Sequence, residues 1–370
     1  MSFPIIVDAH LDLAYNAIGY ARDYRHSAHA IRRLEEDGEH VKHSGECTVG
    51  FPDMLRGRVG LAFATIFVEP ASRGISGNRR GYSDAQEAHA LGMAQMDWYH
   101  RLADTEAHIA LVTDQASLRD VLTDWRVTPA GERMPARPRP LPMTHRIGLV
   151  PLMEGADPIL EPKELERWYE RGLRIVGLAW NTTRYAGGTW EKGRLTKLGH
   201  ELLAMMAEFD MILDVSHLSH ESLYEALDSY EGKHVIASHC NAARFVPNIA
   251  ERHLPDDAIE LLAERKSVIG VVPYNRFLKN DWSGRKRDVT LDDVVRMVDH
   301  ICQVTGSADH VGIGSDLDGG LGYQDIPAEL DTIRDHHKIG DELLQRGYSA
   351  AHVDQFMFGN WLRILRAALP

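Results

Sequence analysis

Short apolar runs recur along the chain, and amphipathic segments of helical length separate most of them. The runs are rich in Val, Ile and Leu and mostly do not alternate with polar residues, as is typical of strands buried on both faces. Strands that alternate with helices predict a parallel sheet. The apolar runs lie at 5–7, 59–68, 109–112, 147–153, 173–180, 211–215, 234–237, 268–272 and 311–313. The amphipathic segments lie at 84–105, 162–171, 197–209, 219–229, 256–265 and 291–305.

A (β/α)8 barrel uses eight strands, one fewer than the number of apolar runs. The run 109–112 is the weakest candidate, because no helix-length segment with clear apolar spacing separates it from the run at 147. Residues 128–144 contain five prolines and several arginines, so we expect a surface excursion there and place 109–112 outside the barrel. With no internal repeat and no low-complexity linker, the sequence predicts one domain, a single α/β (TIM) barrel over residues 1–370.

The chain has 20 histidines but only three cysteines, which lie far apart and form no CxxC pair. A disulfide framework or a cysteine-rich zinc site is therefore not expected, and any metal should be held by histidine and carboxylate. The formal net charge of −13 argues against nucleic acid as a partner, because phosphate binding needs clustered Lys and Arg. No stretch approaches the length of an apolar membrane span and no signal-peptide pattern precedes the first run, so we expect a cytoplasmic protein without membrane attachment.

Residue types that bind metals stand at the ends of several apolar runs. The first run ends in His10 and Asp12, which share one face of a strand because side chains two positions apart point the same way. Glu154 follows three apolar residues, and a carboxylate there is costly to bury unless it is paired or binds metal. Two successive runs end in Ser-His, at His217 and His239. Each of these features taken alone also has an ordinary structural explanation.

The last run leads into Asp316-Leu-Asp318-Gly-Gly, which by itself fits a turn. Taken together, five run ends carry a metal-competent residue, and in a (β/α)8 barrel these ends converge on one mouth. Two cations sharing a bridging carboxylate would use His and Asp on one side and two His on the other. Such ligands suit Zn²⁺, with Mn²⁺, Fe²⁺ or Co²⁺ as alternatives.

Taken together, these motifs resemble those of the membrane (renal) dipeptidase family of zinc peptidases, which belongs with the amidohydrolase-like TIM barrels. The resemblance spans essentially the whole chain, and its motifs occur in family order. The matching segments are Asp8-Ala-His10-Leu-Asp12-Leu, Met153-Glu154-Gly155, Asp214-Val-Ser-His217, Ala237-Ser-His239-Cys-Asn-Ala, Arg252-His-Leu-Pro255, Gly312-Ile-Gly-Ser-Asp316-Leu-Asp-Gly319 and Gly359-Asn360-Trp-Leu-Arg363.

The resemblance implies a set of metal ligands. His10 and Asp12 would bind one zinc ion, and His217 and His239 would bind a second. Glu154 would bridge the two. The expected cofactors are therefore two divalent metal ions per chain, with zinc first among the candidates.

The resemblance also implies catalytic and substrate-binding groups. Asp316 would act as general base or proton shuttle, and Arg252 would hold the substrate carboxylate, a task that suits the fork of a guanidinium. Asp318 is only a candidate for a supporting or turn role. The family's dimers make a homodimer plausible for this chain.

One residue departs from the family pattern. Where the family's dipeptidases carry a histidine that contacts the scissile carbonyl or the oxyanion, this chain has Trp180. An indole N–H can donate one hydrogen bond but cannot become a cation. Stabilisation of the oxyanion would then depend more on the metals and on Arg252, unless Trp180 simply packs under the segment 181–189.

These features predict a metal-dependent hydrolase that cleaves the amide bond of dipeptides, including those that contain D-residues. The expected nucleophile is a hydroxide bridging two cations, with Asp316 moving the proton. An alternative is an amidohydrolase of the same scaffold that acts on N-acyl amino acids, lactams or other small amides. A metal-stabilised binding protein is a third reading, but the presence of all five ligand positions and Asp316 argues against it.

Overall fold

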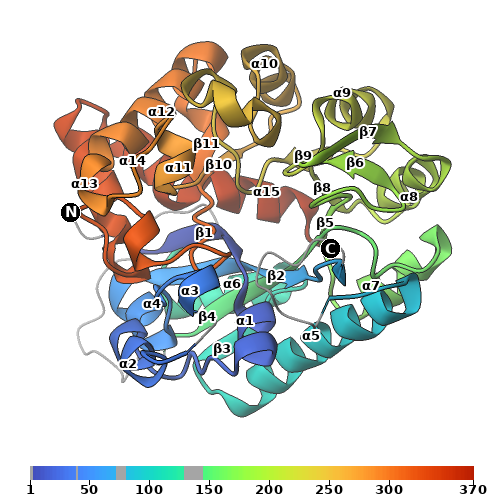
Figure 1. The fold of residues 1–370 in the computed structure, drawn as a ribbon, viewed down its shortest axis with the longest axis horizontal. Coiled ribbons are helices and arrows are strands. Elements are labelled where there is room, and N and C mark those ends of the chain that lie inside the picture. Colours follow the sequence, from blue (N-terminus) through green and yellow to red (C-terminus); the bar gives the residue numbers. More distant parts are fainter. Residues whose placement is uncertain (1–2, 39–40, 72–80, 129–144) are drawn as a thin grey trace.

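The computed structural model describes residues 3–38, 41–71, 81–128 and 145–370. Eight parallel strands in the order β10-β11-β1-β2-β4-β5-β8-β9 form a nearly closed barrel with helices around it (Figure 1). These strands are β1 (Ile6–Leu11), β2 (Val59–Phe67), β4 (Ile147–Glu154), β5 (Ile175–Gly177), β8 (Ile212–Asp214), β9 (His234–Ile236), β10 (Ile269–Val271) and β11 (Val311–Ile313). The predicted (β/α)8 barrel is confirmed.

The barrel closes where the chain leaving β9 meets β10. Ala237 forms a parallel bridge with Ile269, and its carbonyl accepts a hydrogen bond of 2.8 Å from the Gly270 N–H. The backbone is crowded here, because a Cβ on Gly270 would lie 1.9 Å from the Ser238 carbonyl oxygen and one on Gly314 only 1.8 Å from it. Only glycine permits so close an approach of neighbouring strands.

A ninth strand lies beside the barrel rather than in it. β3 (Ile109–Leu111) pairs with β4 off the path of the eight strands, so the expectation for the run 109–112 is confirmed. The expectation that no helix follows it is wrong, because α6 (Gln115–Asp124) does. Asp114 caps this helix by accepting from the Ser117 N–H at 2.7 Å, and its apolar face is too short to stand out from the sequence. Residues 129–144, most of the predicted surface excursion, lie outside the described part of the chain.

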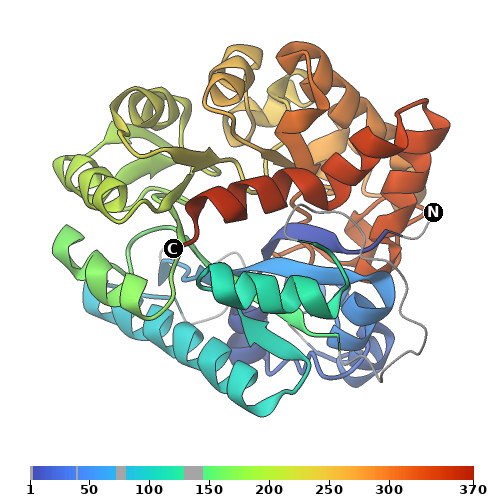
Figure 2. The same ribbon diagram turned by 180° about the vertical axis from the view of Figure 1, so that it is seen from behind.

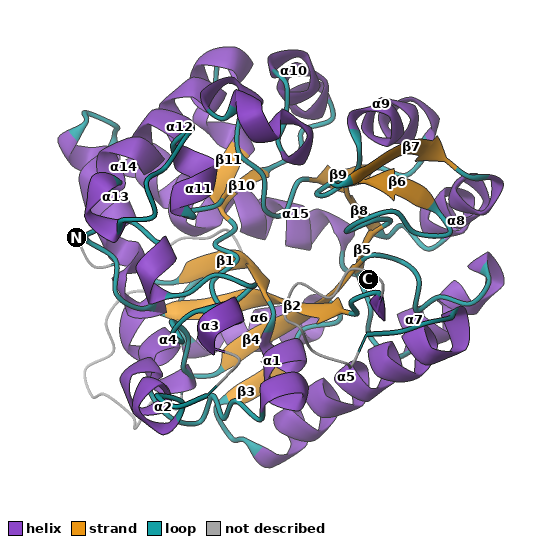
Figure 3. Cartoon of the chain, in the orientation of Figure 1, coloured by secondary structure: helices purple, strands orange, loops and turns teal. Residues whose placement is uncertain are grey.

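All six amphipathic segments form helices close to their predicted bounds. They are α5 (Ala85–Thr105), a 3₁₀ turn (Pro162–Glu164) leading into α7 (Leu165–Glu170), α8 (Lys197–Glu208), α9 (His220–Ser229), α10 (Asp256–Glu264) and α12 (Leu291–Thr305). Figure 3 shows the helices surrounding the strands. None of the helices in the described ranges is both long enough and apolar enough to pass through a bilayer.

Further elements extend the barrel. α1 (Leu13–Tyr20), α2 (Ala28–Leu34), α3 (Val41–Ser44) and α4 (Phe51–Gly57) lie between β1 and β2, and α11 (Asn275–Leu278) follows β10. A small antiparallel hairpin, β6 (Ala186–Gly188) and β7 (Glu191–Leu195), follows β5. The chain ends in α13 (His337–Gln345), α14 (Ala350–Asp354) and α15 (Asn360–Ala368). α15 crosses the barrel on the side seen in Figure 2, where the Trp361 indole N–H donates to the Ile313 carbonyl at 3.0 Å.

Candidate metal centre

The six side chains predicted to bind metal or move protons converge at one mouth of the barrel. Each stands at or just beyond the carboxyl end of a strand, and each is at most 8% exposed. They fall into two groups, and within each group the ligand atoms lie within 4.8 Å of one another. The first cluster is His10, Asp12 and Asp316, and the second cluster is Glu154, His217 and His239.

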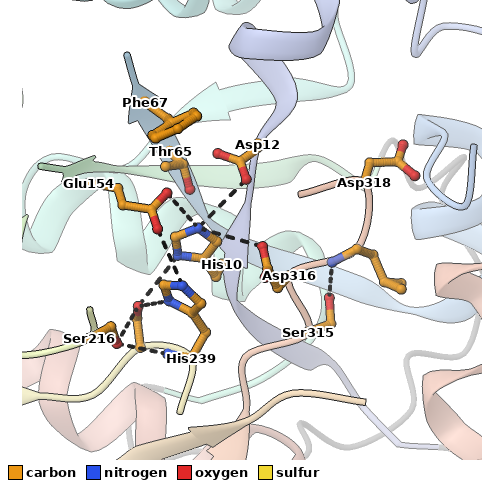
Figure 4. Close-up of polar contacts among 12 residues, drawn as sticks. His10, Asp12, Thr65, Phe67, Glu154, Ser216, His239, Ser315, Asp316 and Asp318 are labelled. Carbon is orange, nitrogen blue, oxygen red and sulfur yellow. Dashed lines mark hydrogen bonds and ion pairs between the residues drawn. The ribbon is translucent and has the colours of Figure 1, made fainter. Parts of the chain in front are cut away.

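Glu154 lies between the two clusters. Its Oε1 is 3.0 Å from Nε2 of His217 and 3.3 Å from Nε2 of His239, whereas its Oε2 is 3.4 Å from Nε2 of His10. Figure 4 shows this carboxylate facing both His10 and His239. The last residue of β4 thus has one oxygen directed to each cluster, the arrangement required of a bridging ligand.

In the first cluster, the spacing of the atoms around Nε2 of His10 fits a metal ion better than a hydrogen-bonded network. Four ligands at about 2.1 Å around a tetrahedral ion lie about 3.4 Å apart. Nε2 of His10 is 3.4 Å from Glu154, 3.8 Å from Asp12 Oδ2 and 4.0 Å from Asp316 Oδ1. This Nε2 and Oδ1 of Asp12 are buried and have no hydrogen-bond partner among the residues that the structure describes. Buried polar atoms are rarely left unpaired, so these atoms fit the role of metal ligands.

The electrostatics of the two clusters favour a cation. Burial, the largest cause, and neighbouring carboxylates together raise the pKa of Asp12 to about 7, that of Glu154 to about 8, and that of Asp316 well above its usual value. Burial also lowers the pKa of His217 and His239 well below the usual value, so both imidazoles are neutral. Neutral histidine is the form that binds metal, and a bound cation would stabilise the ionised carboxylates.

Two of the six residues adopt unusual backbone conformations. His217 has φ of 66° and Asp316 has φ of 56°, both in the left-handed region that non-glycine residues seldom occupy. Backbone strain of this kind concentrates at functional sites. On the outer side of its ring, Nδ1 of His217 lies 3.0 Å from the Thr189 hydroxyl, which belongs to the turn between β6 and β7.

Arg252 lies beside the second cluster at the end of a 3₁₀ segment (Pro247–Arg252) and is 2% exposed. Its Nη2 donates to the His239 carbonyl at 3.0 Å and its Nη1 lies 3.3 Å from the Cys240 sulfur. Its Nε is buried and has no hydrogen-bond partner within the described part of the chain. A charged donor held in this way can bind an anion from the adjoining cavity.

A cavity of about 230 Å³ opens over both clusters. Trp180 and Phe67 form part of its wall and meet edge to face, with ring centroids 5.1 Å apart. The Trp180 ring lies 6.3 Å from that of His217. Trp180 therefore borders the cavity beside the second cluster and is not merely packed under the segment 181–189.

Several cavity residues escaped the sequence analysis. Tyr15, Glu69, Tyr274 and Arg276 also line the cavity, and Tyr15 donates to Glu69 at 3.1 Å. None belongs to a recognisable motif. Their nearness in sequence to Asp12 and to the strand ends was the only available signal.

Asp318 proves to have a structural role. Its carboxylate accepts from the Thr48 N–H at 2.6 Å and the Thr48 hydroxyl at 2.7 Å, and it lies 3.1 Å from Arg22 Nη1. It ties the segment before α4 to the barrel and does not face the clusters. The expectation of a supporting or turn role agrees with this placement.

Comparison with known proteins agrees with this geometry. A family model described as "Membrane dipeptidase (Peptidase family M19)" matches residues 139–369. An uncharacterized dipeptidase of Schizosaccharomyces pombe is 26% identical over 98% of this chain and 80% of its own length. An uncharacterized protein of Klebsiella pneumoniae is 29% identical over 56% of this chain and 76% of its own length.

Among solved structures, a metallo peptidase from Rhodobacter sphaeroides, liganded with a phosphinate mimic of the dipeptide L-Ala-D-Ala, superposes with a TM-score of 0.76. The match covers 99% of this chain and 100% of that one at 20% identity. At that identity the superposition establishes the fold alone.

Proposed function

Since the chain belongs to the membrane dipeptidase family M19 and is a metallo-dipeptidase-like enzyme, we propose that it hydrolyses dipeptides with two divalent metal ions, Zn²⁺ first among them. The observation that carries this proposal is Glu154, whose two oxygens face different clusters. His10 and Asp12 would hold one ion, and His217 and His239 the other. Both ions together would supply activated water near neutral pH and polarise the scissile carbonyl.

Asp316 would move the proton in this reaction. Its Oδ1 lies 4.0 Å from Nε2 of His10, so the carboxylate stands within the first cluster, beside the place where an activated water would be held. It would take a proton from the attacking water and deliver it to the leaving amine. Asp316 would therefore be base and then acid within one turnover.

Arg252 would orient the substrate. Its buried guanidinium borders the cavity beside His239 and has an unpaired Nε, which suits the terminal carboxylate of a dipeptide. Binding the carboxylate there would place the preceding amide over the metal clusters. The phosphinate mimic of L-Ala-D-Ala carried by the R. sphaeroides peptidase supports testing a D-residue at this position.

Trp180 favours a second candidate, an amidohydrolase of N-acyl amino acids or other small carboxylate-bearing amides. Its ring and that of Phe67 make an apolar wall where the family pattern has a histidine. Such a wall would accept an acyl group that lacks an amine.

Kinetics on matched substrates would decide between these candidates. The panel contains L-Ala-L-Ala, L-Ala-D-Ala and the N-acetyl forms of L-Ala and D-Ala, with Zn²⁺ restored before assay. We expect the free dipeptides to give the higher kcat/KM. Turnover of the N-acetyl amino acids alone would support the amidohydrolase, and turnover of none of the compounds by the zinc-loaded protein would overturn both.

A further inference from the structure

One buried hydroxyl touches histidines of both clusters. Ser238, which is fully buried, has its Oγ 2.8 Å from Nδ1 of His239 and 3.4 Å from Nδ1 of His10. The rings of these two histidines are tilted by 33° relative to each other, with centroids 3.7 Å apart. Ser238 thus contacts one histidine of the first cluster and one of the second, on the sides of their rings that face away from Glu154.

Asp214 determines which way this hydroxyl donates. Its Oδ2 lies 2.5 Å from Ser238 Oγ, and its Oδ1 accepts from the N–H groups of Ser216 and Ser238 at 3.0 and 2.9 Å. An ionised carboxylate only accepts hydrogen bonds, so the serine must donate its single proton to Asp214. The two lone pairs of the serine are then free to accept.

The hydrogen bonds to the two histidines follow from the fact that a hydroxyl group has one proton to donate and two lone pairs that accept. With its proton committed to Asp214, Ser238 can only accept from His10 and His239, so each ring carries its proton on Nδ1. Nε2 of each ring is then a lone pair directed at Glu154 and the clusters. The proximity of Asp214, His10 and His239 has the appearance of a third metal site, but the oxygens of Asp214 already accept three hydrogen bonds.

We propose that Ser238, oriented by Asp214, is a positioning residue that sets the metal-binding tautomer of His10 and His239 together and so couples the two ion sites. The inference rests on the two-ion site of the proposed function. Outer hydrogen bonds of this kind typically change metal affinity by about 10–100-fold. The unusual feature here is that a single hydroxyl serves ligands of two ions.

Thr189 provides a matched control, because its hydroxyl touches a histidine of the second cluster only. Its Oγ lies 3.0 Å from Nδ1 of His217 and 3.3 Å from that residue's carbonyl. Thr189→Val should therefore weaken one ion, whereas Ser238→Ala should weaken both. Ser216→Ala removes a neighbouring buried hydroxyl that lies 3.3 Å from Ser238 Oγ and accepts from the backbone N–H of His239 at 3.2 Å. Within the described ranges this hydroxyl has no hydrogen bond to an imidazole, so the change should weaken neither ion by as much as Ser238→Ala.

The experiment measures how many Co²⁺ ions the metal-free protein binds, and how tightly, by competition with a chelator. We expect two ions in the wild type, about a 10–100-fold weaker affinity for both in Ser238→Ala, and a loss confined to one ion in Thr189→Val. Thermal unfolding of the metal-free variants separates a binding defect from a folding defect. Unchanged affinities in Ser238→Ala, or a loss confined to one ion, would overturn the proposal.

Asp214→Asn keeps the shape of the network and reverses its polarity. It is tested in the Ser216→Ala background, which removes the other hydroxyl within reach of Ser238 Oγ, 3.3 Å away. With the amide oxygen at Oδ1, its NH₂ would donate to Ser238, which must then donate to one imidazole and place that ring's proton on Nε2. At least one ion should bind more weakly, although the asparagine side chain is about as large as the aspartate that it replaces. A wild type that binds fewer than two ions would contradict the proposed two-ion site itself; a two-ion wild type with an unaffected Asp214→Asn would contradict only the coupling.

Discussion

Oε1 of Glu154 lies 3.0 Å from Nε2 of His217, yet the two residues do not form an ordinary ion pair. Burial raises the pKa of Glu154 to about 8 and depresses the pKa of His217 well below its usual value. In the absence of a cation, the protein around pH 7 therefore favours a neutral acid beside a neutral imidazole. A divalent ion bound between the two side chains would favour the ionised form of Glu154 and would accept the lone pair of the neutral His217 imidazole.

Removal of the metal should make stability depend on pH in a defined direction. The folded-state pKa values of Asp12 (about 7) and Glu154 (about 8) lie above those of the unfolded chain, whereas burial lowers the pKa of His217 and His239 in the folded state. The two effects oppose each other below the ordinary histidine pKa of about 6.5, but above it only the carboxylates still bind extra protons in the folded state. Stability of the chelated protein should therefore fall as pH rises from about 7 to about 8. Urea unfolding of the chelated enzyme at pH 7 and pH 8 measures this fall, and zinc-loaded protein should lose this dependence. A chelated protein that is more stable at pH 8 would contradict the assignment.

Asp316→Asn should retain the bound metal and lose most turnover. The amide keeps the size of the side chain but cannot take up the proton of the attacking water, so we expect kcat to fall by about 10²–10⁴-fold. Metal content by elemental analysis, measured beside kcat, makes the result interpretable. If the variant instead loses an ion, Asp316 is a ligand of the first cluster, as its 4.0 Å distance from Nε2 of His10 would also permit.

Arg252→Lys should impair the binding of substrates that end in a free carboxylate. The lysine keeps the charge but not the planar fork, and hydrogen bonds to charged groups contribute about 1.5–3 kcal/mol, which corresponds to about 10–100-fold in kcat/KM. A dipeptide amide, which lacks the carboxylate, serves as the control. Equal losses on the acid and the amide would mean that Arg252 acts through its bond to the His239 carbonyl rather than on substrate.

Trp180→His should increase dipeptide turnover. Restoring a side chain that can be both donor and cation beside His217 would add stabilisation to the developing oxyanion, and one such donor is typically worth about 10²–10³-fold in kcat. Trp180→Phe, which keeps the ring contact with Phe67 but removes the N–H, is the matched variant. A fall in kcat with both variants would indicate that the indole itself positions the substrate.

Asp318→Ala should destabilise the fold severely. The change removes two hydrogen bonds to Thr48 and one of the two carboxylates paired with the buried Arg22, which keeps Glu35; each buried polar group left unpaired typically costs about 1–3 kcal/mol. The exposed pair Arg25–Asp23 provides the comparison, since Asp23→Ala should cost less than about 1 kcal/mol. Free energies of unfolding of the two zinc-loaded variants test the contrast.

The barrel and the candidate ligands at its strand ends were predictable from sequence because both depend on local patterns. Buried strands appear as apolar runs, and a candidate ligand at a strand end follows such a run, as Glu154 does at the end of β4. α6 was not predictable, because its buried face comprises only Leu118, Val121 and Leu122, and a short helix gains most of its stability from tertiary packing.

The tertiary structure alone decided how these residues meet. The order of amino acids identified His10, Glu154 and His239 as candidates. The barrel brings the rings of His10 and His239, which are more than 200 positions apart in the chain, to a centroid distance of 3.7 Å, with Glu154 beside both. Packing sets the directions of the side chains. These directions decide that Asp318 faces away from the clusters, and that the Ser238 hydroxyl contacts a histidine of each cluster. Such contacts leave no periodic trace in the chain, because each joins distant segments only once.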